Sequence, residues 1–246
     1  MSKNRIYVKD LKGKPDRFEL TGENANIVGR VLRLKKGDEL ELVDGEGALF
    51  TARLERFSRK SVSLRLENRE LLANEYENKI NLIQAFPKGT RIDLVIQKMV
   101  ELGVNKMALF QAERSVPLLK GKLSGKFERA GKIALEALRQ SKRVYLPEIS
   151  FVSSLEEALS LFKEADLKLF LHEDQTSGRG LREYLDECRS AKEITFAIGP
   201  EGGFSDAEVQ KFKGHGYLQA RLGKEVLRTE TAPIAVMSIL NYKFRW

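Results

Sequence analysis

Hydrophobic and polar positions alternate through the N-terminal part of the chain, as they do in strands that bury one face. The alternation is clearest over residues 39–43, and Asp44 followed by Gly45 is typical of a tight turn. The same pattern predicts strands at residues 5–8, 17–20, 48–54 and 61–66, and residues 24–34 are predicted to form one helix. Short strands joined by turns indicate a small β-barrel.

Near residue 75 the pattern changes to strands that alternate with helices. Residues 80–86 predict a strand, and the next helix has Ile92, Val95, Ile96, Met99 and Val100 at helical spacing up to Gly103. Further strands are predicted at 106–110, 167–171, 194–198 and 218–222, with helices beginning near 181, 205 and 232. This alternation indicates an α/β domain whose parallel sheet is covered by helices on both faces. We place the boundary at residue 72, which gives domains 1–72 and 73–246.

Composition and charge limit the functions that the chain can have. Its 246 residues suffice for one or two domains, and 42% hydrophobic with 32% charged residues is ordinary for a globular protein. A formal net charge of +8 favours a polyanionic partner, nucleic acid first. The lone Cys188 excludes an internal disulfide, and His172 and His215 are too few for a structural zinc site. Because no signal peptide or membrane span is recognisable, we expect a cytoplasmic protein with no metal and no membrane contact.

Much of the positive charge is concentrated in residues 114–143. The basic residues there are Arg114, Lys120, Lys122, Lys126, Arg129, Lys132, Arg139, Lys142 and Arg143, against Glu128 and Glu136. Such a run is usually a solvated helix face, but its concentration favours a surface that contacts phosphates. The aromatic residues of this region are Phe127 and Tyr145, so base stacking on it is not predicted.

Two C-terminal segments can form a ligand site. Gly199, Gly202 and Gly203 follow a predicted strand, and Ser205 with Glu208 forms a capping box that begins the next helix. Backbone N–H groups at such a turn can bind a polar ligand, although a tight connection needs glycine equally. The spacing matches neither phosphate-binding fingerprint, so nucleotide binding is weakly supported.

The second segment, residues 222–233, precedes the last helix. Thr229 or Thr231 can cap that helix, and Glu230 suits its positive end. Residues 234–240 are apolar nearly all round, which predicts burial or a subunit interface. His172 and Glu173 end another predicted strand, at the edge where open α/β sheets bind ligands, although a lone histidine is more often structural.

Taken together, these segments resemble the bacterial 16S ribosomal RNA uridine-N3 methyltransferases, the RsmE family of the SPOUT superfamily. The resemblance covers almost the whole chain in the family's order. The matching stretches are 31–35 with Gly37 and Asp38, 88–93, Gln97 with Lys98, 101–104, 113–115, Gln140 with Ser141, Arg143, Pro147, 171–173, 198–203 and 227–232.

The resemblance implies an N-terminal PUA-like, RNA-binding β-barrel, a C-terminal SPOUT methyltransferase domain with a trefoil knot, and a homodimer. It also implies methyl transfer from S-adenosylmethionine to N3 of a specific uridine, position 1498 in the family, in 16S ribosomal RNA of the small ribosomal subunit. The cofactor would lie between loops 171–173, 198–203 and 222–232.

Individual residues can be given roles, from the resemblance for the cofactor and from position and chemistry for catalysis. The cofactor-binding set is Leu171, His172, Glu173, Ile198, Gly199, Pro200, Glu201, Gly202, Gly203, Leu222, Gly223, Val226, Leu227, Arg228, Thr229 and Ala232. The RNA-binding set is Arg5, Arg30, Arg33, Arg91, Lys98, Arg114, Lys142 and Arg143. For catalysis, Arg228 can stabilise the uracil anion and Glu230 can accept the N3 proton, although helix-end electrostatics explains Glu230 equally well.

Three positions depart from the family, and two other functions stay open. Glu225, after Lys224, stands where the family has an arginine, Arg139 where it has a glutamate, and Asn26 where histidine is common. The alternatives are a non-catalytic RNA-binding assembly factor and a SPOUT methyltransferase that acts on transfer RNA.

Overall fold

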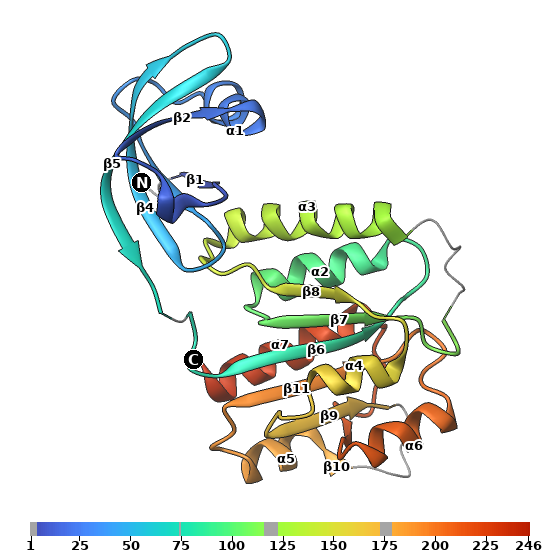
Figure 1. Cartoon of the computed structure of the whole chain (residues 1–246). Coiled ribbons are helices and arrows are strands. Elements are labelled where there is room, and N and C mark those ends of the chain that lie inside the picture. The colour runs from blue at the N-terminus through green and yellow to red at the C-terminus, as the bar shows by residue number, and fades with distance from the viewer. Residues whose placement is uncertain (1–3, 74, 116–122, 173–178) are drawn as a thin grey trace. The chain divides into compact units, whose positions relative to one another are not determined.

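The computed structural model describes residues 4–73, 75–115, 123–172 and 179–246, and the chain divides into two compact units (Figure 1). The first unit extends to Glu75 and includes Leu138–Leu146, and the second holds Tyr76–Ala137 and Pro147–Trp246. The return of the short segment Leu138–Leu146 to the first unit has no counterpart in the sequence pattern. The boundary at residue 72 stays a prediction.

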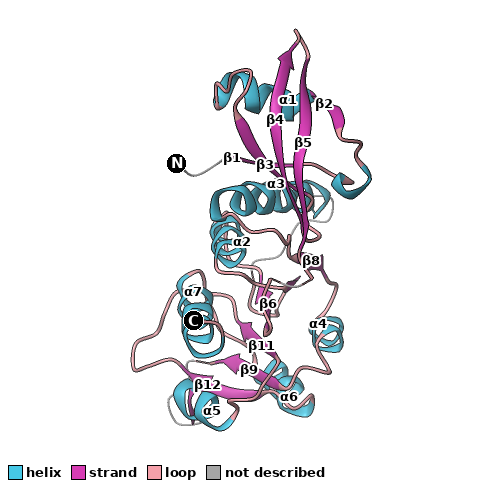
Figure 2. Cartoon of the chain, turned by 90° about the vertical axis from the view of Figure 1, so that its left-hand side faces the viewer, coloured by secondary structure: helices cyan, strands magenta, loops and turns pink. Residues whose placement is uncertain are grey.

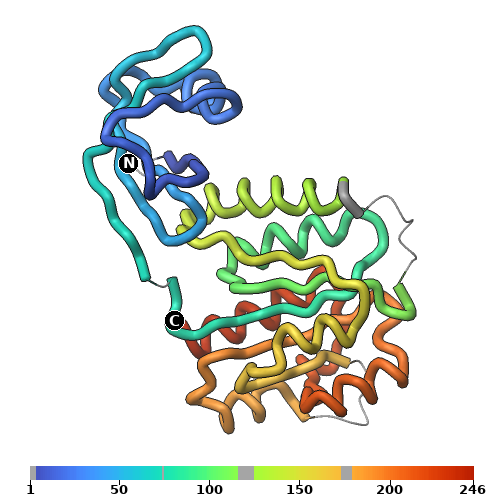
Figure 3. The backbone as a smooth tube through the Cα atoms, viewed as in Figure 1, coloured from blue at the N-terminus to red at the C-terminus, as the bar shows by residue number. Residues whose placement is uncertain are grey.

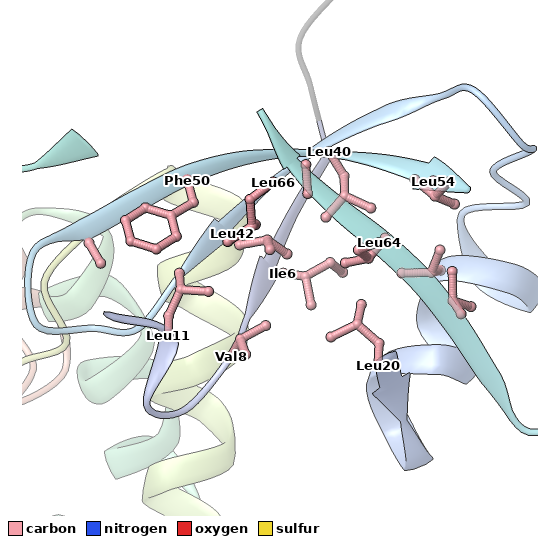
Figure 4. Packing of buried hydrophobic residues seen from close by; sticks show 14 residues of the cluster. Ile6, Val8, Leu11, Leu20, Leu40, Leu42, Phe50, Leu54, Leu64 and Leu66 are labelled. Carbon is pink, nitrogen blue, oxygen red and sulfur yellow. The ribbon is translucent and has the colours of Figure 1, made fainter. Parts of the chain in front are cut away.

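The first unit is built on a five-stranded sheet in the order β1-β3-β4-β5-β2. Its strands are β1 (Asn4–Tyr7), β2 (Arg17–Thr21), β3 (Glu39–Val43), β4 (Ala48–Phe57) and β5 (Ser61–Leu71). β1 and β3 are parallel, and the other neighbours are antiparallel. Alternate side chains such as Leu42, Phe50 and Leu64 gather in one core (Figure 4). The predicted strands are confirmed, and closure into a barrel stays a prediction.

The helix predicted over residues 24–34 is confirmed in part, because the chain is helical from Gly22 to Val31 but does not form one regular α-helix. A short 3-10 turn, η1 (Leu11–Gly13), precedes β2, and after β2 the chain forms α1 (Gly22–Asn26), which passes directly into a π-helical turn, η2 (Ile27–Val31). Ile27, Val28 and Val31 are β-branched, and such side chains crowd the preceding turn of a regular α-helix. Val28 is fully buried in the core of the unit.

The second unit contains a seven-stranded sheet in the order β10-β12-β9-β11-β6-β7-β8, and all its paired strands are parallel. The strands are β6 (Lys79–Ala85), β7 (Lys106–Phe110), β8 (Glu148–Phe151), β9 (Leu167–Leu171), β10 (Arg179–Gly180), β11 (Glu193–Ile198) and β12 (Leu218–Arg221). The helices are α2 (Arg91–Glu101), α3 (Leu123–Ser141), α4 (Leu155–Leu161), α5 (Leu181–Glu187), α6 (Asp206–Gly214) and α7 (Thr231–Phe244).

Helices cover both faces of this sheet, as the sequence predicts. Figure 2 shows α2 and α7 on one face and α4 and α6 on the other. The apolar positions predicted for α2, from Ile92 to Val100, are its buried side chains. β8 and α4 were not predicted, because a four-residue edge strand and a seven-residue helix carry little periodic signal.

The order of the strands brings distant parts of the chain together. β11 is inserted between β6 and β9, where Figure 3 shows it in orange beside the teal β6, and β12 is inserted between β9 and β10. In the register of the sheet, Leu171 at the end of β9 pairs with Ile198 on one side and with Ala220 on the other. The carboxyl ends of β9, β11 and β12 therefore lie side by side, which is where open parallel sheets bind ligands.

Candidate functional site

A cavity of about 460 Å³ lies at these three strand ends. That volume is within the range of small-molecule and cofactor sites. The lining residues are Arg91, Leu171, His172, Ile198, Gly199, Pro200, Glu201, Gly203, Ala220, Arg221, Leu222, Gly223, Lys224, Glu225, Val226, Leu227, Arg228, Thr229, Glu230 and Ala232.

The structure gathers nearly all of the predicted cofactor-binding residues around this cavity. Gly202 does not line it: its carbonyl oxygen instead accepts a hydrogen bond of 3.1 Å from Nη1 of Arg114. Glu173 lies outside the described residues. Ala220 and Arg221 line the cavity but were missed, since only the alignment of β12 with β9 brings them there. Whether these residues bind a cofactor stays a prediction.

A buried hydrogen-bond relay connects two of the loops to the sheet. Gln84, on β6, donates from Nε2 to the Thr229 hydroxyl at 3.2 Å, and that hydroxyl donates to the carbonyl oxygen of Gly199 at 2.7 Å. Thr229 does not cap the last helix, and neither does Thr231, because α7 begins at Thr231. The hydroxyl of Thr229 instead joins loop 222–232 to loop 198–203.

The glycine turn after β11 is held from both sides. A side chain at Gly199 would place its Cβ 3.3 Å from the backbone of Gly203, which itself has a positive φ of 67°. Behind the turn, Ser205 and Glu208 form the predicted capping box, which is confirmed. Phe204 packs against Phe212 with ring centroids 4.7 Å apart. Glycine is therefore needed here for close backbone approach, and the turn is rigidly anchored.

One arginine, at the N-terminus of α2, contacts two carboxylates. Arg91 forms an ion pair with Glu201 and approaches Glu230, with 3.5 Å between its Nε and the Glu230 Oε1. The other carboxylate oxygen of Glu230, Oε2, is buried and has no hydrogen-bond partner among the described residues. Glu230 also makes no side-chain hydrogen bond that caps α7. This oxygen can therefore accept a proton, or a hydrogen bond, from a bound molecule.

Arg228 is exposed and lines the same cavity. Its carbonyl oxygen accepts the first N–H bonds of α7, from Thr231 and Ala232. Within the described ranges its guanidinium makes no ion pair or side-chain hydrogen bond, so a fully charged donor group is available for a ligand.

Glu201 is expected to stabilise the fold only while it is ionised. Burial alone would raise its pKa, but N–H groups of Glu201 and Lys88 and the Arg91 guanidinium outweigh burial and lower the pKa. A lowered pKa in the folded state adds stability above the unfolded value, about 4.3, that is lost as the pH falls through the folded value.

We therefore expect Glu201→Gln to reduce the free energy of unfolding by about 1 kcal/mol near neutral pH, and less in acid. Urea unfolding of both proteins between pH 7 and pH 3 checks this. The difference should be constant down to about pH 5 and shrink below about pH 4.3. A difference that keeps its full size in acid would contradict the assignment.

The residues predicted to contact RNA fall into two groups. Arg30, Arg33 and Lys142 are exposed in the first unit. Arg5 and Arg143 instead form ion pairs inside that unit: Arg5 with Glu41 at 2.7 Å, and Arg143 with Glu75 at 2.6 Å.

In the second unit, each of the predicted RNA-binding residues has an internal contact. Lys98 pairs with Glu101 at 2.8 Å, Arg114 bonds to Gly202, and Arg91 pairs with the two cavity carboxylates. Of the predicted basic segment, Lys120 and Lys122 lie outside the described residues.

Two further properties concern the parts of the chain that the structure describes. In those parts no cluster of three or more histidine, cysteine, aspartate or glutamate side chains is arranged to hold a metal ion. Across the same residues, no helix is both long and apolar enough to cross a membrane.

Comparison with known proteins identifies the family. Residues 74–241 match the family model of the RNA methyltransferase domain, and residues 20–67 match that of the RNA methyltransferase PUA domain. The ribosomal RNA small subunit methyltransferase E of Bacillus subtilis is 31% identical over 92% of this chain and 90% of its own. That of Buchnera aphidicola from Acyrthosiphon pisum is also 31% identical, over 98% of this chain and 93% of its own.

Solved structures support the same family. The ribosomal RNA small subunit methyltransferase E of Neisseria gonorrhoeae bound to S-adenosylmethionine has a TM-score of 0.87 and 28% identity, covering 98% of each chain. A methyltransferase of Legionella pneumophila in complex with the same cofactor has a TM-score of 0.85 and 35% identity, again over 98% of each. The chain therefore belongs to the RsmE family of RNA methyltransferases.

Proposed function

We propose that this chain uses S-adenosylmethionine to methylate N3 of a specific uridine in 16S ribosomal RNA of the small ribosomal subunit. The observation that carries the proposal is the cavity formed where β9, β11 and β12 end, in a chain of this family. Relatives named as small-subunit ribosomal RNA methyltransferases, and neighbours that hold the cofactor, support it.

The residues of the cavity fit this cofactor. Leu171, Ile198 and Leu222 offer apolar surface for a flat adenine ring, and the backbone around Gly199 can approach a ligand closely. The lining carries both signs of charge, which suits a molecule with a sulfonium, an ammonium and a carboxylate. When bound, S-adenosylmethionine supplies an electrophilic methyl group.

The side chains of the chain have two tasks in this reaction. N3 of uracil carries a proton and is normally paired in a duplex, so the target base must be unpaired or flipped out before it can enter the cavity. As N3 loses its proton, negative charge spreads to the carbonyl oxygens of the base, where the exposed guanidinium of Arg228 can stabilise it. The unpartnered Oε2 of Glu230 is suited to accept the proton.

RNA contacts are proposed for basic side chains in each unit taken separately. Arg30, Arg33 and Lys142 are exposed and suit contacts to phosphates. In the second unit, Arg91, Lys98 and Arg114 lie outside the core and keep their proposed role. Arg5 and Arg143 receive less support, because their own side chains are only 7% and 4% exposed.

We also infer the finer architecture and the assembly that the family resemblance implies. The five-stranded sheet and the match to the PUA domain support a PUA-like barrel. The late insertion of β11 and β12 between earlier strands supports a knotted backbone. Exposed apolar side chains on and after α7, namely Ile239, Tyr242 and Trp246, support a homodimer that covers them. The proposed ribosomal substrate implies a cytoplasmic location.

Calorimetric titration with S-adenosylmethionine tests the proposal against that of a non-catalytic RNA-binding factor. We expect one cofactor site for each chain, and we expect Gly199→Val to remove binding because its side chain would collide with the Gly203 backbone. Ser160→Ala, an exposed change on α4, is the control. If the unaltered protein shows no cofactor binding, the chain is not a methyltransferase of this kind.

A further inference from the structure

A second, smaller cavity of about 110 Å³ lies in the same unit, on the other side of the start of α2. Arg91 lines the large cavity, whereas its neighbours Thr90 and Ile92 line the small one. The small cavity is below the size of ordinary cofactor sites, and its volume suits one small planar group. We name it the α2–α3 pocket, because Lys126 and Arg129 of α3 form its other wall.

Two aromatic rings line the α2–α3 pocket, and a third, Phe127, lies beside it against Phe151. Phe86 and Phe151 line it with their ring centroids 5.7 Å apart, and Phe127 lies 5.1 Å from Phe151. Phe86 is buried and belongs to the core, but Phe127 is 54% exposed on the surface of α3. Packing in the core accounts for Phe86. It does not account for Phe127, whose outer face is open to a ligand.

The charges of the pocket favour an anionic occupant. Arg129 is paired with Asp93, the acidic residue of the lining, at 2.6 Å, which neutralises both. Lys126 makes no ion pair with any described residue, and its Nζ lies 5.3 Å from the centre of the Phe86 ring. The pocket therefore combines apolar side chains with one uncompensated positive charge, and the exposed ring of Phe127 lies beside it.

This combination matches the chemistry of a single-stranded nucleotide. Bases stack on exposed aromatic rings whatever their sequence, and a lysine beside the ring can hold the adjoining phosphate. We propose that the α2–α3 pocket binds an unpaired nucleotide of the RNA substrate next to the target uridine, with the base on Phe127 and Phe151 and the phosphate at Lys126. The proposal rests on the proposed function, because the target base occupies the neighbouring large cavity.

Steady-state methylation of small ribosomal subunits that lack the modification tests the pocket. We expect Phe127→Ala and Lys126→Ala each to raise the KM for subunits about tenfold, while kcat and the cofactor Kd stay unchanged. Phe127→Trp should have the KM of the unaltered protein, because it keeps a stacking surface. Lys213→Ala is the matched control, since Lys213 is an exposed lysine of α6 outside both the pocket and the basic segment 114–143.

Photo-cross-linking to a hexauridylate that carries 5-iodouridine gives a readout that does not need methylation. We expect cross-links at Phe127 or Phe151 in the unaltered protein and their loss in Phe127→Ala. If the unaltered protein methylates no subunits, the proposed function fails and the cross-links alone decide on the pocket. If it does methylate them, an unchanged KM in Phe127→Ala and Lys126→Ala overturns the pocket, and so does the absence of cross-links there in any case.

Discussion

Arg228→Ala is expected to lower kcat for methylation about 100- to 1,000-fold while cofactor binding stays measurable. The magnitude is that of removing one charged donor that stabilises a developing anion in an active site. The guanidinium of Arg228 is exposed and has no ion-pair partner among the described residues, so its removal should leave the fold unchanged. Single-turnover methylation of small subunits, with a parallel cofactor titration, measures both quantities.

Two further variants make the result on Arg228 specific. Arg228→Lys keeps the charge without the planar guanidinium, and we expect it to recover part of the rate. Arg182→Ala removes an arginine from the exposed surface of α5 and should leave kcat as it is in the unaltered protein. Full activity of Arg228→Ala would exclude this side chain from the reaction.

Thr229→Val is expected to weaken cofactor binding about tenfold or more and to destabilise the protein. The change keeps the shape of the side chain but removes the hydroxyl that joins Gln84 to the carbonyl oxygen of Gly199. Gln84 would keep only its bond to the carbonyl oxygen of Ala85, and the half-buried carbonyl oxygen of Gly199 would lose the donor Thr229, which costs about 1–3 kcal/mol. The loss also frees two of the loops that line the cavity. Calorimetric titration and urea unfolding measure the two effects.

Thr231→Val is the matched control for this prediction. Thr231 is the first residue of α7 and is exposed, so the same loss of a hydroxyl should change stability by less than about 0.5 kcal/mol. It should leave the cofactor Kd unchanged. If Thr229→Val binds the cofactor as the unaltered protein does, the relay does not position the loops.

Features carried by neighbouring residues could be predicted from the sequence. The full helical period from Ile92 to Val100 located α2, and Ser205 with Glu208 located the start of α6, because both signals lie within a few turns of backbone. The alternation of strands and helices likewise predicted the parallel sheet. The strand ends at Leu171 and Ile198 followed from the same pattern.

Features that depend on partners far along the chain could not be predicted. Threonine often caps helices, so the sequence around Thr229 suggested a cap. The hydroxyl of Thr229 instead donates to Gly199, which is 30 residues away. Arg143 was predicted to contact RNA, but it is buried and pairs with Glu75, 68 residues earlier. The alignment of β12 with β9 decided that Ala220 lines the cavity, and no local pattern encodes that pairing.

The proposed methyl transfer is tested most directly by mapping modified nucleosides in ribosomal RNA by mass spectrometry. Small subunits from a bacterial strain that lacks this gene are incubated with the purified chain and S-adenosylmethionine, and their 16S RNA is digested. We predict that one 3-methyluridine appears with the unaltered chain and that it forms at least about 100-fold more slowly with Arg228→Ala. If no 3-methyluridine forms, or if the methyl group appears only in transfer RNA supplied in parallel, the proposed substrate and reaction are contradicted.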